Sequence, residues 1–301
     1  MKVGIDLGGS HIAIGVVDEN GRIIEKQERR ILDKEKQEIK TFIEEYIIKN
    51  IKEMSKKYKI TNIGIAIPGT VNKTSVIKSV NLNLENYNIV EALKKKINIP
   101  IKIKNDAKCA ALAENKYGSL KDYKRSIFIG LGTGIGGAVI VDDKLLDTGD
   151  LPGCEIGHMI IQKDGLECKC GKKGCFEKYA SMKAFKTNLR KELNLDETTR
   201  GEELLNILRN NNENNKNYKK IEKIVNDYIE YLSIGISNLI NIFEPEAIVI
   251  GGSFVYFEDV LLNRLYKKII EGNLLFNKRD SLIIKLAVLG NDAGIIGASL
   301  L

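Results

Sequence analysis

One histidine and three cysteines lie close together in the sequence, and their types and spacing suit a metal ion. They are His158, Cys168, Cys170 and Cys175. One imidazole and three thiolates form a complete tetrahedral ligand set for Zn²⁺. Because four protein ligands leave no open coordination position, we expect a structural zinc ion that holds a loop over residues 153–179 and does not activate water.

The same stretch carries two carboxylates that a metal-held loop could present to a ligand. Glu155 precedes His158, and Glu177 follows the last cysteine. When one ring nitrogen of His158 binds the metal, the other remains able to form a hydrogen bond. The alternative interpretation is a disulfide-bonded surface loop, which a reducing cytosol disfavours. The amino terminus does not resemble a signal peptide, so we expect a cytoplasmic protein.

Composition places the chain among ordinary globular proteins and argues against two other classes. Its 301 residues are 43% hydrophobic and 29% charged, which is enough for two packed lobes. No apolar run approaches the roughly 20 residues that cross a bilayer. The net charge of +7 is spread along the chain without a compact basic tract. We therefore expect neither a membrane protein nor a nucleic-acid binder, although a mildly basic surface favours the approach of a nucleotide.

Hydrophobic periodicity predicts an α/β protein whose first three strands form an antiparallel meander. Alternating and continuous apolar runs mark the strands, and apolar residues at three- and four-residue spacing mark the helices. The strands expected in the first half cover 2–6, 12–17, 22–27, 63–67 and 101–104, and the helices cover 34–58, 89–97 and 107–117.

The second half repeats the opening pattern, which predicts two duplicated lobes. A strand, a glycine-rich turn, a second strand and an acidic turn recur over 129–146. Helices are expected over 181–193, 201–208 and 218–243, and strands over 247–250 and 282–288. We expect a small amino-terminal lobe over 1–119, against which the carboxyl-terminal helix in 290–301 packs, and a larger lobe over 120–289 that includes the zinc loop.

Three glycine turns follow predicted strands at positions where a backbone could close on phosphate oxygens. They lie at Gly8-Gly9-Ser10, Gly132-Thr133-Gly134-Ile135-Gly136-Gly137 and Gly251-Gly252-Ser253. No Gly-Lys-Ser or Gly-Lys-Thr follows them, and the first two lead into strands, so neither a Walker loop nor a dinucleotide-binding turn fits. A nucleotide held between duplicated lobes fits better.

Asp106 lies where a predicted strand ends and a predicted helix begins. Ligands of α/β sheets commonly bind at such positions. Asp is also a preferred helix cap, so this residue alone leaves a functional and a purely structural interpretation open.

With these motifs laid out, the chain resembles the ROK family of repressors and sugar kinases along nearly its whole length. The resemblance rests on Asp6 to Ser10, Asn105-Asp106-Ala107, Leu131 to Gly137, Glu155-x-Gly-His158, and Cys168 to Glu177. It implies a two-lobed actin-like, ribonuclease-H-like ATPase fold that binds ATP, Mg²⁺ and a sugar. It departs from many relatives at His11, for which local hydrogen bonding is the simpler role.

The resemblance also implies residue roles. Asp106 would be the catalytic base that accepts the proton of the attacking sugar hydroxyl. The residues implied to bind the sugar are Gly69, Asn81, Asn105, Asp106, Glu155, His158 and Glu177. Those implied to bind ATP and Mg²⁺ are Asp6, Gly8, Gly9, Ser10, Gly132, Thr133, Gly134, Gly251 and Gly252.

The activity implied by the resemblance is ATP-dependent phosphorylation of a hexose at its 6-hydroxyl, with glucose favoured. The alternatives are a kinase for N-acetylmannosamine, N-acetylglucosamine, fructose or mannose, and a sugar-responsive regulator without kinase activity. The first predicted strand begins at Lys2, which leaves no residues ahead of it for a helix-turn-helix and favours the kinase. The family also implies a homodimer.

Overall fold

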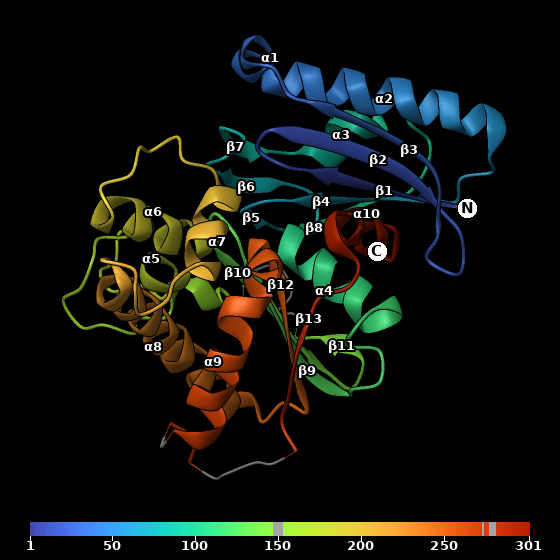
Figure 1. The fold of residues 1–301 in the computed structure, drawn as a ribbon. Coiled ribbons are helices and arrows are strands. Elements are labelled where there is room, and N and C mark those ends of the chain that lie inside the picture. The colour runs from blue at the N-terminus through green and yellow to red at the C-terminus, as the bar shows by residue number, and fades with distance from the viewer. Residues whose placement is uncertain (147–152, 273, 277–280) are drawn as a thin grey trace. The chain divides into compact units, whose positions relative to one another are not determined.

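The computed structural model describes residues 1–301 except 147–152, 273 and 277–280, and no predicted site residue falls in those gaps (Figure 1). The chain divides into two compact units. Unit 1 contains Met1–Asp122, Val288–Leu301 and the described residues of a short segment, 143–146 and 153–154. Unit 2 contains Tyr123–Asp142 and the described residues between Glu155 and Ala287.

Unit 1 is built on a five-stranded sheet in the order β3-β2-β1-β4-β8. Its strands are β1 (Lys2–Leu7), β2 (His11–Val17), β3 (Ile23–Arg30), β4 (Asn62–Ile67) and β8 (Ile101–Asn105). The antiparallel pairing of β1 with β2 and of β2 with β3 confirms the predicted meander. β4 runs parallel to β1, and β8 runs parallel to β4. The central strands are buried on both faces, which explains their continuous apolar runs.

Helices cover both faces of this sheet (Figure 1). They are α1 (Asp33–Gln37), α2 (Ile39–Lys57), α3 (Ile89–Lys94), α4 (Asp106–Tyr117) and α10 (Ala293–Ser299), with a 3₁₀ turn η3 (Gly290–Asp292) before the last. The single helix expected over 34–58 is wrong, because the chain breaks at Glu38 between α1 and α2. Ile39, Ile43 and Ile47 begin the buried stripe of α2. The charged residues of α1 bury no side chain, so packing does not keep α1 in line with α2.

A small second sheet of unit 1 is absent from the sequence-based prediction. It contains β5 (Thr70–Val71), β6 (Val76–Ser79) and β7 (Leu84–Tyr87), in the order β5-β6-β7. These strands span two to four residues each, which is too short for a readable alternation of apolar and polar positions. The sheet matters because it holds the chain that connects Gly69 to Asn81.

Helix α10 lies directly on the backbone of the main sheet in unit 1. A side chain at Gly4 or Gly64 would overlap the carbonyl oxygens of Ile295 and Ala298, and one at Gly297 would overlap that of Cys109. Gly4 and Gly64 therefore permit the close approach of α10 to the sheet, and Gly297 permits its close approach to α4. The contact brings the start of α10 next to the end of β1.

Unit 2 repeats the topology of unit 1. The second five-stranded sheet contains β9 (Arg125–Leu131), β10 (Ile135–Val141), β11 (Lys144–Leu145), β12 (Ala247–Gly252) and β13 (Ile283–Leu286), in the order β11-β10-β9-β12-β13. All of these strands except β11 belong to unit 2. β9 and β10 are antiparallel, whereas β12 is parallel to both β9 and β13. The two sheets share one strand order, which confirms the predicted duplication.

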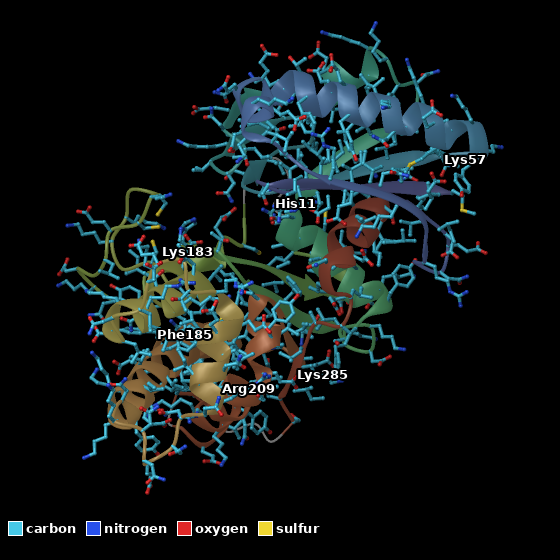
Figure 2. All side chains as sticks on the ribbon, turned by 45° about the horizontal axis from the view of Figure 1, so that its top comes forward. His11, Lys57, Lys183, Phe185, Arg209 and Lys285 are labelled. Carbon is cyan, nitrogen blue, oxygen red and sulfur yellow. The ribbon has the colours of Figure 1, made fainter. Side chains whose placement is uncertain are left out.

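The helices of unit 2 enclose an aromatic core. They are η1 (Ile156–His158), α5 (Glu177–Ala180), α6 (Met182–Glu192), α7 (Gly201–Arg209), α8 (Tyr218–Phe243), η2 (Ser253–Phe257) and α9 (Glu258–Glu271). Phe185 of α6 is buried against Tyr228 and Phe257, with ring centroids 4.4 and 6.2 Å away (Figure 2). In the part of the chain that the structure describes, no helix has the length and apolar character needed to cross a membrane.

Candidate active site and metal centre

In unit 1 the predicted site residues gather where three parallel strands end. The register pairs Asp6 of β1 with Ala66 of β4, and Ile67 of β4 with Asn105 of β8. Parallel strands present their carboxyl ends at one edge of a sheet, which is the usual ligand-binding edge of α/β folds. The first glycine turn, Gly69 and Asp106 follow these ends.

Asn105, rather than Asp106, caps helix α4. Its Oδ1 accepts hydrogen bonds from the backbone N–H groups of Ala107 and Lys108, at 3.0 and 3.3 Å. Its Nδ2 donates to the carbonyl oxygen of Gly69 at 3.0 Å. Asp106 is the first helical residue, and its Oδ1 accepts from the N–H of Ala107 at 2.8 Å. The interpretation of Asp106 as a plain helix cap is therefore wrong.

The two carboxylates of this edge share an unfavourable electrostatic environment. Burial, and then the charge of Asp106, raise the pKa of Asp6 to about 7. Burial also raises the pKa of Asp106, although the N–H of Ala107 opposes the shift. A pair of half-buried carboxylates resists ionisation unless a cation compensates its charge. Asp106 is therefore suited to accept a proton, and Asp6 is suited to lie beside a bound cation.

Sequence reasoning missed Gly294 as part of this edge. A Cβ placed on Gly294 would lie 2.5 Å from Oδ2 of Asp6, so the glycine at the start of α10 makes room for the carboxylate. The glycine-containing segment 291–298 was predicted only to pack on the amino-terminal lobe as part of the carboxyl-terminal helix. Its sequence distance from Asp6 hides the contact.

The first glycine turn connects β1 to β2 and lies against Asn81. Gly8 donates its N–H to the carbonyl oxygen of His11 at 2.8 Å, which closes the turn. A Cβ on Gly9 would lie 2.9 Å from that of Asn81. His11, labelled in Figure 2, has its Nδ1 2.8 Å from Oγ of Ser10. The structure thus places Gly8, Gly9, Ser10 and Asn81 together.

In unit 2 the other two glycine turns also follow neighbouring parallel strands. The register pairs Gly251 with Gly130 and Gly252 with Leu131, so β9 and β12 end side by side. Gly132, Thr133 and Gly134 follow β9, and Gly132 donates its N–H to the carbonyl oxygen of Gly134 at 3.0 Å. Gly252 has a φ of +74° and lies against the carbonyl oxygen of Leu131, a conformation that favours glycine.

Glu177 is tied to the turn after β9. Its Oε2 accepts a hydrogen bond from the N–H of Ile135 at 3.0 Å, and a side chain at Gly134 would overlap this carboxylate. Glu155 precedes η1, whose Gly157 packs on the carbonyl oxygen of Ile135. The predicted sugar-binding residues of unit 2 therefore surround the start of β10.

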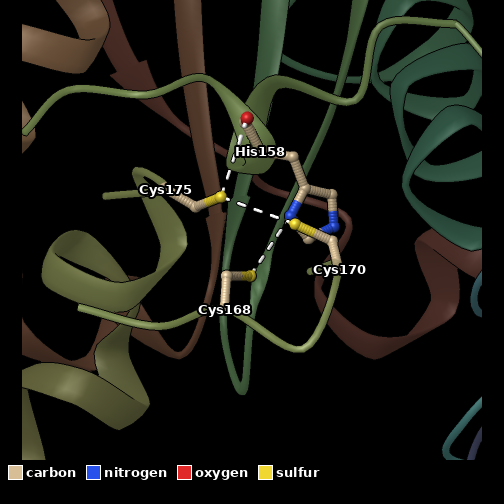
Figure 3. Close-up of side chains that lie close together, drawn as sticks. All are labelled: His158, Cys168, Cys170 and Cys175. Atoms are coloured by element: carbon tan, nitrogen blue, oxygen red, sulfur yellow. Dashed lines mark hydrogen bonds between the residues drawn. The ribbon is translucent and has the colours of Figure 1, made fainter. Parts of the chain in front are cut away.

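The four predicted metal ligands form one cluster (Figure 3). Their donor atoms all lie within 4.8 Å of one another. Nδ1 of His158 is 3.6 Å from Sγ of Cys168, and Sγ of Cys170 is 3.6 Å from that of Cys175. The cysteines are free thiols, so the disulfide alternative is wrong. One imidazole nitrogen and three sulfurs fit tetrahedral Zn²⁺. If Nδ1 of His158 binds the metal, Nε2 is left for a hydrogen bond.

Backbone hydrogen bonds shape the metal-binding loop. Cys168 donates its N–H to the carbonyl oxygen of Lys172 at 2.8 Å, and Gly171 donates to that of Cys168 at 3.0 Å. Phe176 donates to the carbonyl oxygen of Met159 at 2.8 Å. These bonds join the two ends of the loop near His158. The loop therefore positions Glu155 and His158 near one of its ends and Glu177 at the other.

The predicted residues fall into two groups. Unit 1 contains Asp6, the first glycine turn, Gly69, Asn81, Asn105 and Asp106, whereas unit 2 contains the other two glycine turns, Glu155, Glu177 and the metal cluster. Within each unit the structure brings the residues together.

Two sheets of one strand order, with glycine turns after their parallel strands, define a duplicated α/β protein of the actin-like ATPase class. The chain belongs to the ROK family, whose model matches residues 2–301. A glucokinase of Streptomyces coelicolor is 30% identical over 99% of this chain and 96% of its own length. The xylose repressor of Bacillus subtilis is 28% identical over 99% of this chain and 76% of its own length.

A solved structure of the same family has a closely similar fold. It is a ROK family glucokinase from Streptomyces griseus in complex with glucose and AMPPNP. It superposes with a TM-score of 0.80 at 25% identity, covering 99% of this chain and 97% of that one.

Proposed function

We propose that this protein is an ATP-dependent hexose kinase that phosphorylates the 6-hydroxyl, with glucose as the favoured sugar. The observation that carries the proposal is Asp106, a half-buried carboxylate with a raised pKa at the carboxyl edge of a parallel sheet. Membership of the ROK family and the similarity to glucokinases support the same activity.

Asp106 is proposed as the general base. A carboxylate whose pKa is raised accepts a proton more readily than an ordinary aspartate does, and it needs only hydrogen-bond reach of the sugar hydroxyl. The hydroxyl oxygen would then attack the γ-phosphorus of ATP as its proton passes to Asp106, and ADP would leave. Asn105 would hold the start of α4, and hence Asp106, in place through its two capping hydrogen bonds.

The sugar would be held by carboxylates, amides and an imidazole. The residues proposed for this role from the family resemblance are Gly69, Asn81, Asn105, Glu155, His158 and Glu177. Neighbouring sugar hydroxyls suit such groups because each hydroxyl both donates and accepts a hydrogen bond. His158 would bind the metal through Nδ1 and the sugar through Nε2, so the metal would orient a substrate-binding residue.

The nucleotide would lie against the glycine turns. Gly8, Gly9, Ser10, Gly132, Thr133 and Gly134 are proposed to surround the phosphates, and Gly251 and Gly252 the adenosine. Asp6 would face Mg²⁺, which when bound neutralises charge on the phosphate oxygens. The half-buried carboxylates of Asp6 and Asp106 favour such a cation because it relieves their repulsion.

The proposal also covers the role of zinc, the oligomeric state and the cellular compartment. Zn²⁺ on His158, Cys168, Cys170 and Cys175 would stabilise the loop and take no part in the reaction. Free thiols in that cluster suit a reducing compartment, so we propose a cytoplasmic enzyme. A homodimer is proposed from family membership alone.

Two alternatives are tested by the same experiments. The sugar could be fructose, mannose, N-acetylglucosamine or N-acetylmannosamine, since a single substituent is read by pocket shape. The similarity to a xylose repressor supports a sugar-responsive regulator as the second candidate. Release of ADP measured with each sugar tests the kinase, and activity with glucose above all others is the expected result. Sugar binding without ADP release from any of them would favour the regulator.

A further inference from the structure

Helix α6 touches both glycine turns of unit 2. Near its amino end, Lys183 donates its backbone N–H to the carbonyl oxygen of Gly132 at 3.1 Å (Figure 2). One turn further along, Nζ of Lys186 lies 3.4 Å from Oγ of Ser253, which directly follows Gly252. Because β9 and β12 end side by side, α6 runs past the ends of both strands. Lys186 is thereby positioned beside the third glycine turn.

The ammonium of Lys186 is half-buried and has no counterion among the residues that the structure describes. The charge of Arg190, one helical turn along α6, acts on this ammonium, and the Arg190 guanidinium donates to the carbonyl oxygen of Thr199 at 3.0 and 2.7 Å. Burial, and then the charge of Arg190, lower the pKa of Lys186. A lysine kept only for packing normally pairs with a carboxylate or extends into water.

Two neighbours fix the position of the Lys186 ammonium group. Nζ lies over the ring of Phe257, 5.1 Å from its centroid, and the hydroxyl of Ser253 lies beside it. Both neighbours come from η2, the segment that follows the third glycine turn. The cation is therefore fixed beside backbone that the proposed function assigns to the nucleotide.

We propose that Lys186 binds an anionic oxygen of the nucleotide's phosphate chain, a role that rests on the proposed function. A lysine ammonium acts as a point charge for phosphate, and a bound phosphate supplies the missing counterion. Gly251 and Gly252 would then contact the nucleoside while Lys186 attracts its phosphates. The residue contributes to binding and takes no part in proton transfer.

Binding measurements separate this role from a structural one. AMPPNP, ADP and adenosine are titrated into the wild type, Lys186→Met, Lys186→Arg and Lys191→Met. Methionine retains the apolar stem without the charge, and Lys191 is an exposed lysine on the same helix. Loss of one charge-assisted contact should weaken AMPPNP and ADP binding about tenfold in Lys186→Met. Adenosine affinity should stay within about twofold, since it carries no phosphate.

The controls keep the outcomes distinct. Lys191→Met should bind like the wild type, and Lys186→Arg should recover most of the affinity. Unchanged AMPPNP binding in Lys186→Met, or an equal loss for adenosine, overturns the inference while leaving the kinase proposal intact. A wild type that binds no nucleotide overturns the kinase proposal itself. Thermal unfolding of Lys186→Met within a few degrees of the wild type shows that a loss of affinity reflects binding.

Discussion

Replacing Asp6 by asparagine should make the protein more stable while it removes activity. The native pKa of Asp6 is about 7, against an ordinary value of 3.8. At roughly 1.36 kcal/mol per pKa unit, ionising this residue in the folded protein costs about 4 kcal/mol as an upper bound. Asp6 keeps part of its surface exposed, so we expect a gain of about 2 kcal/mol for the neutral, isosteric variant.

The effect should depend on pH in a defined direction. Between 3.8 and about 7 the folded protein holds a proton on Asp6 that the unfolded chain has lost. Stability therefore falls more steeply as pH rises through this window in the wild type than in Asp6→Asn, which lacks this contribution. The difference between Asp6→Asn and the wild type should be small near pH 4 and largest near pH 8.

Urea unfolding at pH 5 and pH 8, in buffer without magnesium, measures this difference. Magnesium is left out because a cation bound at Asp6 would favour its charged form. Asp122→Asn is the matched control, since Asp122 is exposed in the same unit and its replacement should change stability little at either pH. An Asp6→Asn variant less stable than the wild type at pH 8, or a difference independent of pH, would refute the reasoning.

Three further predictions concern the site. Asp106→Asn should lower kcat by about 10²–10⁴ while glucose affinity changes little. Because the pKa of Asp106 is raised, kcat/KM of the wild type should already fall at a pH above 3.8, the ordinary aspartate pKa, as the solution is acidified. Normal turnover in the variant would exclude Asp106 as the base. Cys170→Ala should lose zinc and weaken sugar binding, whereas Cys154→Ala, outside the cluster, should keep one zinc per chain by elemental analysis. Gly134→Ala should raise KM for the sugar several-fold, because the new methyl group displaces the Glu177 carboxylate from the N–H of Ile135; an unchanged KM would count against a sugar-binding role for Glu177.

Much of the fold was predictable because long, strongly periodic segments dominate it. Helix α8 begins and ends at the predicted residues 218 and 243, since its buried stripe runs along the whole helix. The opening meander followed from three apolar runs and a tight turn. The strands β5, β6 and β7 were not predicted, because pairing with neighbours stabilises them and their own sequences are too short to show it.

Some residues of the site could be predicted from the sequence, and others could not. Metal ligands are readable because residue type and spacing carry the chemistry, and His158, Cys168, Cys170 and Cys175 do lie together. Contacts between distant segments are not readable in this way. Gly294 against Asp6 and Lys186 beside Ser253 depend on how helices pack on a sheet, and no local pattern reports them. Likewise, Asp106 and Asn105 are both good caps, so only the structure separates their roles.

Phosphorus NMR of glucose incubated with ATP, Mg²⁺ and the purified protein tests whether this protein is a sugar kinase. We expect the γ-phosphate signal of ATP to disappear as glucose 6-phosphate and ADP appear, and Asp106→Asn to slow this conversion by about 10² or more. Conversion that requires another hexose would correct only the choice of sugar. ATP left intact with glucose and with every other hexose tried would contradict the assignment as a sugar kinase.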